Sequence, residues 1–250
     1  MGAGEQIFKR YEIKYLLNGE QYRELQQRLH PYLTEDEYGE TEICNCYYDT
    51  PDFRLIRNSL EKPVYKEKLR MRSYGTPKDG KSRVYLELKK KFQGVVYKRR
   101  EQMSLEQASN MMNGKIRSAD TQILREIEWF CNYYQNLYPA MYVSYHRIAL
   151  LEKEKKEEYF LEEKSKGSNL RVTFDWDIRW RTEEVDLDKG NYGNSLLLPE
   201  QRIMEIKTPA SIPKWLADIL DEMEIFPSSC SKYGKAYEQW KHGIMKEDIA

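Results

Sequence analysis

The stretch from Val64 to Tyr74, which reads VYKEKLRMRSY, constrains the fold of this chain more than any other segment. Its even positions from 66 to 72 are all basic, whereas the odd positions between and beside them include leucine and methionine. Alternate side chains of a β-strand leave opposite faces of the sheet, so the pattern predicts a strand with four cations on one face. These cations are Lys66, Lys68, Arg70 and Arg72. A protein interior does not hold unpaired like charges, so this face either meets solvent or binds a polyanion.

The overall charge excludes one class of partner. Lys plus Arg and Asp plus Glu are equal at 41 each, so the net charge is zero. Proteins that coat nucleic acid carry a broad excess of basic residues, which this chain lacks. We therefore expect no nucleic-acid partner. If the chain binds an anion, its basic residues must therefore be concentrated on one surface. The oligomeric state is left open.

Length and hydropathy place the chain among globular proteins of the cytoplasm. The 250 residues contain no internal repeat and no linker, so residues 1–250 are expected to form a single domain. No apolar run approaches membrane-spanning length, and the N-terminus lacks the apolar core of a signal peptide. We therefore expect a cytoplasmic protein with no membrane segment.

The alternating pattern recurs in at least five other segments. Residues 8–17 place Arg10, Glu12 and Lys14 on one face, and residues 83–92 do the same for Glu87 and Lys89. The segments 95–101, 141–150, 170–180 and 202–209 alternate in the same way. Their polar faces include Lys98, Tyr145, Arg147, Arg171, Glu205 and Lys207.

Apolar residues at helical spacing predict amphipathic helices between these strands. They include residues 19–33 and segments that begin near residues 104, 118, 211 and 233. Ser118 and Ser211 are expected to begin two of them, and Pro51 to open a further short helix.

These elements predict an α+β protein. Any single charged stripe is typical of a solvated sheet face, but the repeated pairing of basic residues with sparse carboxylates is not. The apolar strand faces need cover, which the helices supply. A closed antiparallel β-barrel with a polar, basic lumen and helices packed outside meets both demands. Because desolvating an unpaired ion is costly, such a lumen must contain water and a bound polyanion, with its carboxylates placed to hold a metal.

The motifs resemble a known family. RYEIKY at 10–15, YYDTPDF at 47–53, LEKPVYKEKLRMRSYG at 60–75 and YLELKKK at 85–91 carry the resemblance, together with SYHR at 144–147, LRVTFD at 170–175, MEIKTP at 204–209 and SKYGKAY at 231–237. They are similar to the VTC-domain polyphosphate polymerases of the stand-alone bacterial type, within the CYTH-like triphosphate tunnel metalloenzymes. The resemblance implies an eight-stranded antiparallel tunnel. It also implies an enzyme that transfers the γ-phosphoryl of ATP to a growing inorganic polyphosphate chain.

The resemblance also implies roles for individual residues. Arg70, Arg72, Lys89, Arg147 and Lys207 are expected to hold the triphosphate during catalysis. Phosphate contacts are expected from Lys14, Lys98, Tyr145, Arg171, Ser231 and Lys232, and the charged stripe adds Lys66 and Lys68. Glu205 is expected to bind Mn²⁺ or Mg²⁺, with Glu87 or Glu12 as a further ligand.

Two departures from the family pattern leave alternatives open. Ser59 and Ser229 stand where related enzymes carry basic residues. The first position of the E-x-E-x-K signature of the tunnel enzymes is Arg10 here, which by resemblance argues against the small-molecule triphosphatase branch. The lost cations weaken the grip on substrate unless Lys66 and Lys68 compensate. A tunnel triphosphatase and a polyphosphate-binding module without turnover therefore remain alternatives.

Overall fold

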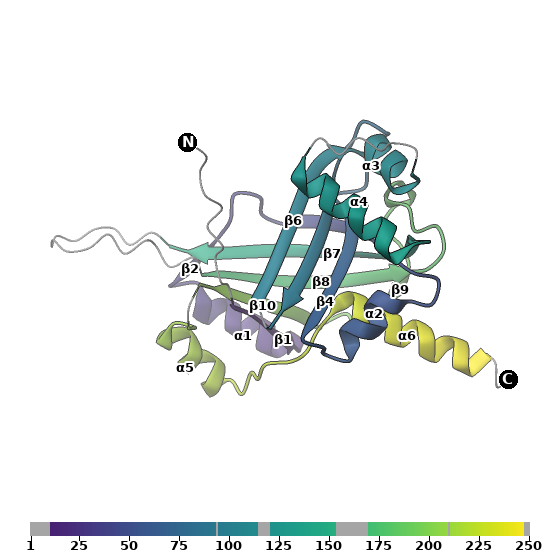
Figure 1. The fold of residues 1–250 in the computed structure, drawn as a ribbon. Coiled ribbons are helices and arrows are strands. Elements are labelled where there is room, and N and C mark those ends of the chain that lie inside the picture. Colours follow the sequence, from purple (N-terminus) through teal and green to yellow (C-terminus); the bar gives the residue numbers. More distant parts are fainter. Residues whose placement is uncertain (1–10, 94, 115–120, 154–169, 210, 248–250) are drawn as a thin grey trace, which may run out of the picture. The chain divides into compact units, whose positions relative to one another are not determined.

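The computed structural model describes residues 11–93, 95–114, 121–153, 170–209 and 211–247. They form an antiparallel sheet of ten strands with helices (Figure 1). The strands are β1 Tyr11–Leu17, β2 Leu33–Glu35, β3 Thr41–Asp49, β4 Tyr65–Tyr74, β5 Arg83–Phe92, β6 Val95–Ser104, β7 Tyr138–Glu152, β8 Arg171–Arg181, β9 Asn194–Ser195 and β10 Arg202–Thr208. The helices are α1 Gly19–Leu29, α2 Arg54–Leu60, α3 Leu105–Met112, α4 Gln122–Tyr134, α5 Lys214–Glu222, α6 Lys232–Glu247 and the 3₁₀ helix η1 Leu187–Lys189.

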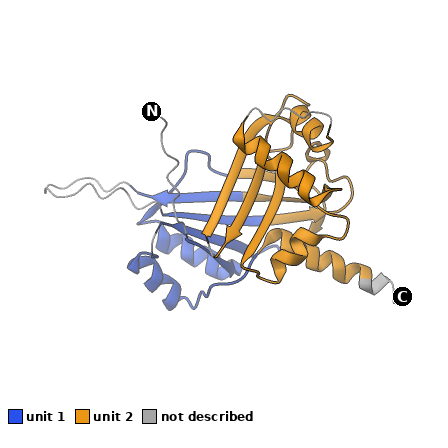
Figure 2. Ribbon diagram, viewed as in Figure 1, with its two compact units in different colours: residues 1–40, 147–176, 197–230 blue, residues 41–146, 177–196, 231–250 orange. Residues whose placement is uncertain are grey.

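The chain divides into two compact units (Figure 2). Unit 1 contains residues 1–40, 147–176 and 197–230, and unit 2 contains residues 41–146, 177–196 and 231–250. Strands β7 and β8 each contribute residues to both units. The single domain over residues 1–250 stays a prediction.

In unit 1 the strand order is β1-β10-β8-β7, with β2 paired to β7. The register places Lys14 opposite Glu205, and Glu205 opposite Thr173. Residues directly opposite in an antiparallel pair share a face, so this polar face is continuous over three strands. The charge alternation read from the sequence is thus confirmed for β1, β8 and β10.

The other face of the unit 1 sheet is apolar and is covered by α1 and α5. Helix α1 begins after Asn18, whose side chain accepts from the backbone of Gln21 in a capping box. The core that joins the helices to the strands contains Tyr15, Leu17, Leu25, Leu29, Val172, Phe174, Met204, Ile206, Leu216 and Leu220.

In unit 2 the strand order is β7-β3-β4-β5-β6. The odd positions of β4 and the even positions of β5 point into a core beneath α3 and α4. That core includes Cys44, Cys46, Leu69, Met71, Val84, Leu86, Leu88, Ala108, Ile127 and Phe130. Burial of one face alone leaves the cation face of β4 on the opposite side of the sheet. The predicted strand at β4 and the predicted strand at β5 are both confirmed.

Helices α2 and α6 lie side by side in unit 2 (Figure 1). A Cβ added at Gly234 in α6 would meet Leu60 Cδ2 of α2 at 3.0 Å. A larger residue at this position would require the Leu60 side chain to move where α6 passes the end of α2.

Several sequence expectations are corrected. Helix α2 begins at Arg54 rather than at Pro51, and α5 has Pro213, not Ser211, at its N-cap position. Helix α1 ends at Leu29 because the chain after it forms the three-residue strand β2. Helix α4 begins at Gln122 with Thr121, not Ser118, as its N-cap. Arg10 and Ser118 themselves lie outside the described residues.

The structure contains two short strands in addition to the eight that were predicted. β2 and β9 contain only three and two residues and lie off the main path of eight strands. Over the described residues that path ends at β1 and β6 without a recorded pairing between them. Closure into a barrel with a lumen is therefore not shown. Among the described helices, none has the length and apolarity needed to cross a membrane.

Candidate functional site

The polar side of β4, β5 and β6 in unit 2 carries a dense group of cations, which we call the basic face. The register brings these side chains into rows, because opposite residues of neighbouring strands share a face. The basic face consists of Lys66, Lys68, Arg70, Arg72, Glu87, Lys89, Lys91, Lys98 and Arg100.

Two rows of the basic face contain lysines directly opposite one another. Lys68 faces Lys89, which faces Lys98, and Lys66 faces Lys91. Like charges in such positions destabilise a sheet. Burial lowers the pKa of Lys66, and the neighbouring lysines, Lys91 first, lower it further. The fold therefore retains electrostatic repulsion between these lysines. An anion bound to the basic face would reduce that repulsion.

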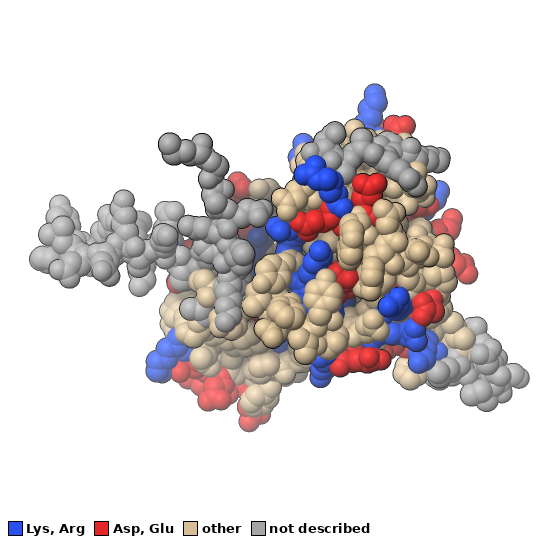
Figure 3. Space-filling view, in the orientation of Figure 1, with Lys and Arg blue, Asp and Glu red and all other residues tan. Residues whose placement is uncertain are grey.

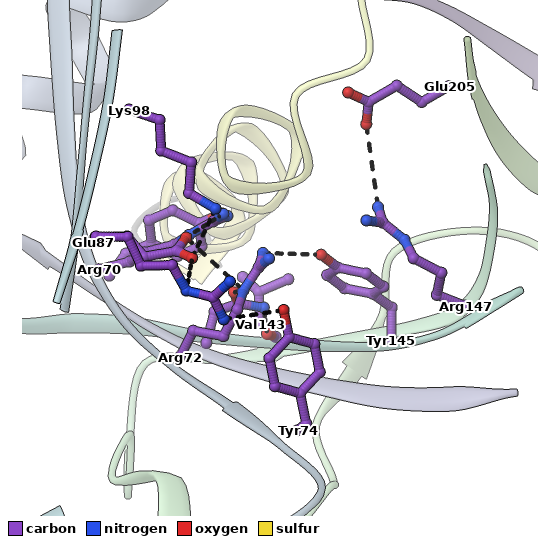
Figure 4. Close-up of polar contacts among 12 residues, drawn as sticks. Arg70, Arg72, Tyr74, Glu87, Lys98, Val143, Tyr145, Arg147 and Glu205 are labelled. Carbon is purple, nitrogen blue, oxygen red and sulfur yellow. Dashed lines mark hydrogen bonds and ion pairs between the residues drawn. The ribbon is translucent and has the colours of Figure 1, made fainter. Parts of the chain in front are cut away.

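A neighbouring row contains one carboxylate, Glu87, which is almost completely buried. Its Oε2 lies 2.7 Å from Arg70 Nη2, and its Oε1 lies 2.8 Å from Lys98 Nζ. Arg100 Nε lies 3.3 Å from Oε1, and Arg72 Nε lies 4.0 Å from Oε2 (Figure 4). Four cations thus share one carboxylate, and positive charge remains in excess.

The same contacts shift the ionisation of Glu87 and Lys98. Burial by itself raises the pKa of Glu87, but Arg70, Arg72 and Lys98 outweigh it and hold the pKa well below its usual value. Burial lowers the pKa of Lys98 to about 8, although Glu87 opposes that shift. Lys98 is thus a cation whose charge changes near neutral pH.

Arg72 is held in one orientation by two neutral groups. Its Nε donates to Asn45 Oδ1 at 2.8 Å, and its Nη2 donates to Tyr145 Oη at 3.1 Å (Figure 4). Asn45 in turn donates to the backbone oxygen of Val143 at 2.8 Å. These neutral partners fix the guanidinium plane, while the nearest oxygen of Glu87 stays 4.0 Å from Nε. Tyr145 thus lies beside Arg72, and its role near phosphate stays a prediction.

The start of α6 adjoins the basic face. Ser231 Oγ accepts from Lys68 Nζ at 3.1 Å, and Lys232 Nζ lies 4.4 Å from the centroid of the Tyr145 ring. The structure therefore brings Lys68, Ser231 and Lys232 together with Arg70 and Arg72 in unit 2, although they come from distant parts of the chain. Lys66 Nζ donates to the backbone oxygen of Ser59 at 3.1 Å, which places a cation beside Ser59.

A second polar group lies on the sheet of unit 1, and we call it the Glu205 face. Glu12 stands opposite Lys207, and Lys14 opposite Glu205. Lys207 Nζ lies 3.5 Å from Glu205 Oε1. The predicted residues Glu12, Lys14, Glu205 and Lys207 are therefore brought together. Arg171 stands opposite Lys207 but is half exposed, and its Nη2 donates to Asp36 Oδ2 at 2.9 Å.

Arg147 is held on the Glu205 face by a carboxylate that the sequence reasoning did not assign. Its Nε and Nη2 donate to Asp175 at 2.6 and 2.8 Å, and Asp175 is fully buried. Arg147 Nη2 also lies 4.0 Å from Glu205 Oε2 (Figure 4). The strict alternation of residues 170–180 had placed Asp175 on the face of Arg171, which was the available signal.

A hard divalent ion fits the donors around Glu205. The Glu205 carboxylate is largely buried, and the opposite residue, Thr173, is fully buried with no hydrogen-bond partner for Oγ1 among the described residues. Mg²⁺ in phosphate enzymes takes one or two protein oxygens and completes its shell with water and substrate phosphates. No group of three or more His, Cys, Asp or Glu side chains suited to a metal occurs in the part of the chain that the structure describes. Mn²⁺ or Mg²⁺ at Glu205 stays a prediction.

The other two carboxylates expected to bind metal have different surroundings. Glu87 is contacted by the four cations described above, which compete with a metal ion for its oxygens. Glu12 stands opposite a lysine, Lys207. Their metal roles stay predictions.

Figure 3 shows one outer face of the protein, where basic and acidic side chains are interspersed. Neither sign gathers into a large patch on that face. This mixture contrasts with the lysine rows of the basic face. The chain thus has a net charge of zero, but a group of its basic side chains is concentrated on one part of the sheet.

Comparison with solved structures finds the fold elsewhere at low sequence identity. A putative adenylate cyclase from Bacillus halodurans matches with a TM-score of 0.50 at 14% identity, over 89% of this chain and 95% of that one. A putative adenylate cyclase from Vibrio parahaemolyticus matches with a TM-score of 0.47 at 12% identity, over 92% of this chain and 98% of that one. A protein from Pyrococcus horikoshii OT3 matches with a TM-score of 0.43 at 14% identity, over 92% and 99%.

A search of curated proteins found no match. The sequence profile of one family, described as the VTC domain, matches residues 9–241. That match covers nearly the whole chain. The chain belongs to the VTC domain family.

Proposed function

We propose that this protein is a metal-dependent polyphosphate polymerase that transfers the γ-phosphoryl of ATP to a growing inorganic polyphosphate chain. The observation that carries the proposal is the basic face. Its lysine rows and the single shared carboxylate leave an excess of partly buried positive charge that a phosphate chain neutralises. Membership of the VTC domain family supports the same substrate class.

Phosphoryl transfer needs positioning and charge neutralisation more than covalent chemistry by the protein. A terminal oxygen of the polyphosphate chain attacks the γ-phosphorus of ATP, the bond between that phosphorus and the β–γ bridging oxygen breaks, and ADP leaves with the bond's electron pair. Arg70, Arg72 and Lys89 on the basic face bind phosphoryl oxygens. Lys66, Lys68, Lys98, Ser231 and Lys232 bind further phosphates.

On the Glu205 face, Arg147 and Lys207 neutralise charge that develops on the transferred group. Arg147 is oriented for this by the two hydrogen bonds that it donates to Asp175. Glu205, with Thr173 opposite it, would hold Mn²⁺ or Mg²⁺. Such an ion supplies Lewis-acid polarisation of a phosphoryl oxygen.

Incubation of the purified protein with ATP and Mn²⁺ tests the proposal. We expect long polyphosphate on a gel and ADP in equal amount to the phosphoryl groups incorporated. Release of orthophosphate without polymer would instead identify a tunnel triphosphatase, the alternative that the same basic face supports equally.

A binding module without turnover is the second alternative, and Ser59 motivates it as a missing cation. The contact of Lys66 with the Ser59 backbone oxygen argues that a cation is nevertheless present there. Calorimetry with polyphosphate and an ATP-consumption assay separate the two functions. Tight binding without nucleotide consumption in any divalent metal would overturn the enzyme proposal.

A further inference from the structure

Asp49 is a fully buried carboxylate at the end of β3, in the motif YYDTPDF. Its Oδ1 accepts from the backbone N–H groups of Thr50 at 2.9 Å and Leu55 at 2.8 Å. Its Oδ2 accepts from the backbone N–H of Ile56 at 3.0 Å and from Tyr233 Oη at 2.8 Å. The carboxylate therefore ties the β3–α2 corner to the first turn of α6.

Tyr233 is buried and makes a second contact through its ring. The ring stacks on that of Tyr47, with centroids 4.4 Å apart and planes at 12°. Tyr47 Oη in turn accepts from Arg70 Nη1 at 3.2 Å. The ring of Tyr233 thus packs on Tyr47, which accepts a hydrogen bond from Arg70. The hydroxyl of Tyr233 donates to Asp49.

The two residues before Tyr233 are both expected to bind phosphate. Ser231 Oγ accepts from Gly234 N at 3.1 Å as the cap of α6, and it also accepts from Lys68 Nζ at 3.1 Å. The Lys232 ammonium lies over the Tyr145 ring, whose hydroxyl accepts from Arg72. Ser231 and Lys232 are placed by α6, and Tyr233 is the buried residue that anchors its first turn.

We propose that Asp49 and Tyr233 are positioning residues for phosphate binding: they hold the first turn of α6 so that Ser231 and Lys232 lie beside Lys68 on the basic face. The proposal rests on the proposed function, because it assigns an oligophosphate ligand to that face. It gives a physical role to the aspartate of YYDTPDF and the tyrosine of SKYGKAY. Neither residue itself contacts the phosphate.

Tyr233→Phe tests the proposal, because it removes the hydrogen bond and keeps the stacked ring. The matched control is Tyr237→Phe, one turn later on α6, where the buried ring contacts Phe53 and Trp240. Both variants are titrated with inorganic polyphosphate of defined length by calorimetry. A hydrogen bond to a charged group stabilises by an amount equal to about tenfold in a binding constant. We expect affinity to fall about tenfold in Tyr233→Phe and to be unchanged in Tyr237→Phe.

A double-mutant cycle with Lys232→Ala separates positioning from general destabilisation. If Tyr233 acts through Lys232, adding Tyr233→Phe to Lys232→Ala produces a smaller loss than it does in the wild type. Hydrogen exchange should also become faster for residues 231–237 in Tyr233→Phe. If Tyr233→Phe does not fold, Asp49→Asn is measured in the same way.

Three results would overturn the proposal, and they are distinguishable. Wild-type affinity in folded Tyr233→Phe removes the positioning role while leaving the proposed function intact. An equal loss with and without Lys232→Ala assigns the effect to stability alone. Absence of polyphosphate binding by the wild type refutes the proposed function, and the positioning role with it.

Discussion

Arg147 and Asp175 form a two-hydrogen-bond pair in which the carboxylate is fully buried and the guanidinium side chain is 15% exposed. A buried ion pair loses more when one partner is removed than the pair itself contributes, because a charge is left unpaired. Arg147 Nη2 also lies 4.0 Å from Glu205 Oε2. Asp175 therefore governs both the stability of the Glu205 face and the orientation of its arginine.

Asp175→Asn should lower the free energy of unfolding by about 3 kcal/mol, because the neutral amide leaves Arg147 without its buried counter-charge. Urea unfolding followed by circular dichroism measures the change. The control is Asp177→Asn, whose pair with Arg179 at 2.7 Å is about 40% exposed on both sides. An exposed pair contributes about 1 kcal/mol or less. Equal effects of the two substitutions would contradict the assignment.

Glu205→Gln should abolish Mn²⁺ binding while polyphosphate binding persists or tightens, because the change removes a negative charge from a group of cations. Activity should fall by more than the roughly 10–100-fold that loss of an outer-shell partner costs. Paramagnetic resonance of Mn²⁺ measures occupancy independently of turnover. A folded Glu205→Gln protein with near-normal ATP turnover would end the metal assignment.

Thr173→Val should weaken Mn²⁺ binding about tenfold if its buried hydroxyl faces the ion, and it should leave the fold intact because valine has the same shape. The comparison variant is Ser73→Ala, another buried hydroxyl without a hydrogen-bond partner among the described residues. Ser73 stands opposite Cys44 on the apolar side of β4. Unchanged Mn²⁺ affinity in Thr173→Val would remove the hydroxyl from the ion's surroundings.

Glu87→Gln should destabilise the protein by about 3 kcal/mol at pH 7, because four cations lose their shared carboxylate. The folded-state pKa of Glu87 is depressed, so its contribution is present above the ordinary glutamate pKa and is lost as the pH falls toward the folded value. The difference between wild type and variant in urea unfolding should therefore shrink below about pH 4.5. Added polyphosphate should restore stability to the variant. Glu106→Gln, on the exposed first turn of α3, is the control.

Lys98 should make polyphosphate binding weaken between pH 7 and pH 9, because its pKa is about 8 and the cation is lost above that value. Lys98→Arg keeps a charge throughout this range, so its affinity should vary less. Calorimetry in buffers of different ionisation enthalpy should detect proton uptake when the wild type binds at pH 8.

The pH dependence of stability has the opposite sign to the pH dependence of polyphosphate binding. Between pH 8 and the ordinary lysine pKa, the unfolded chain holds more protons at position 98 than the folded chain does. The Lys98 contribution to the free energy of unfolding therefore rises with pH over that window. A flat pH dependence of both quantities in the wild type would contradict the shifted pKa.

The main strands and their two faces could be predicted from the residue pattern alone. Alternation at Lys66, Lys68, Arg70 and Arg72 predicted β4 and its cation side, and residues 83–92 predicted β5 with its bounds. Alternation is a property of the backbone within one strand, so it can be read without knowing which strands pair. Short elements were predicted less well. The three-residue strand β2 was not predicted, and α2 begins at Arg54, after a turn, rather than at Pro51.

Which charged side chains contact one another could not be predicted before the strands were paired. The row of Lys68, Lys89 and Lys98 depends on the register of three strands, and the Arg147–Asp175 pair joins two strands separated by a long connection. The contact of Asp49 with Tyr233 spans 184 positions. Such contacts follow from strand pairing and helix packing, which depend on burial summed over the whole fold. A local pattern states that a cation leaves one face of a strand, whereas the partner across that face is set by the register.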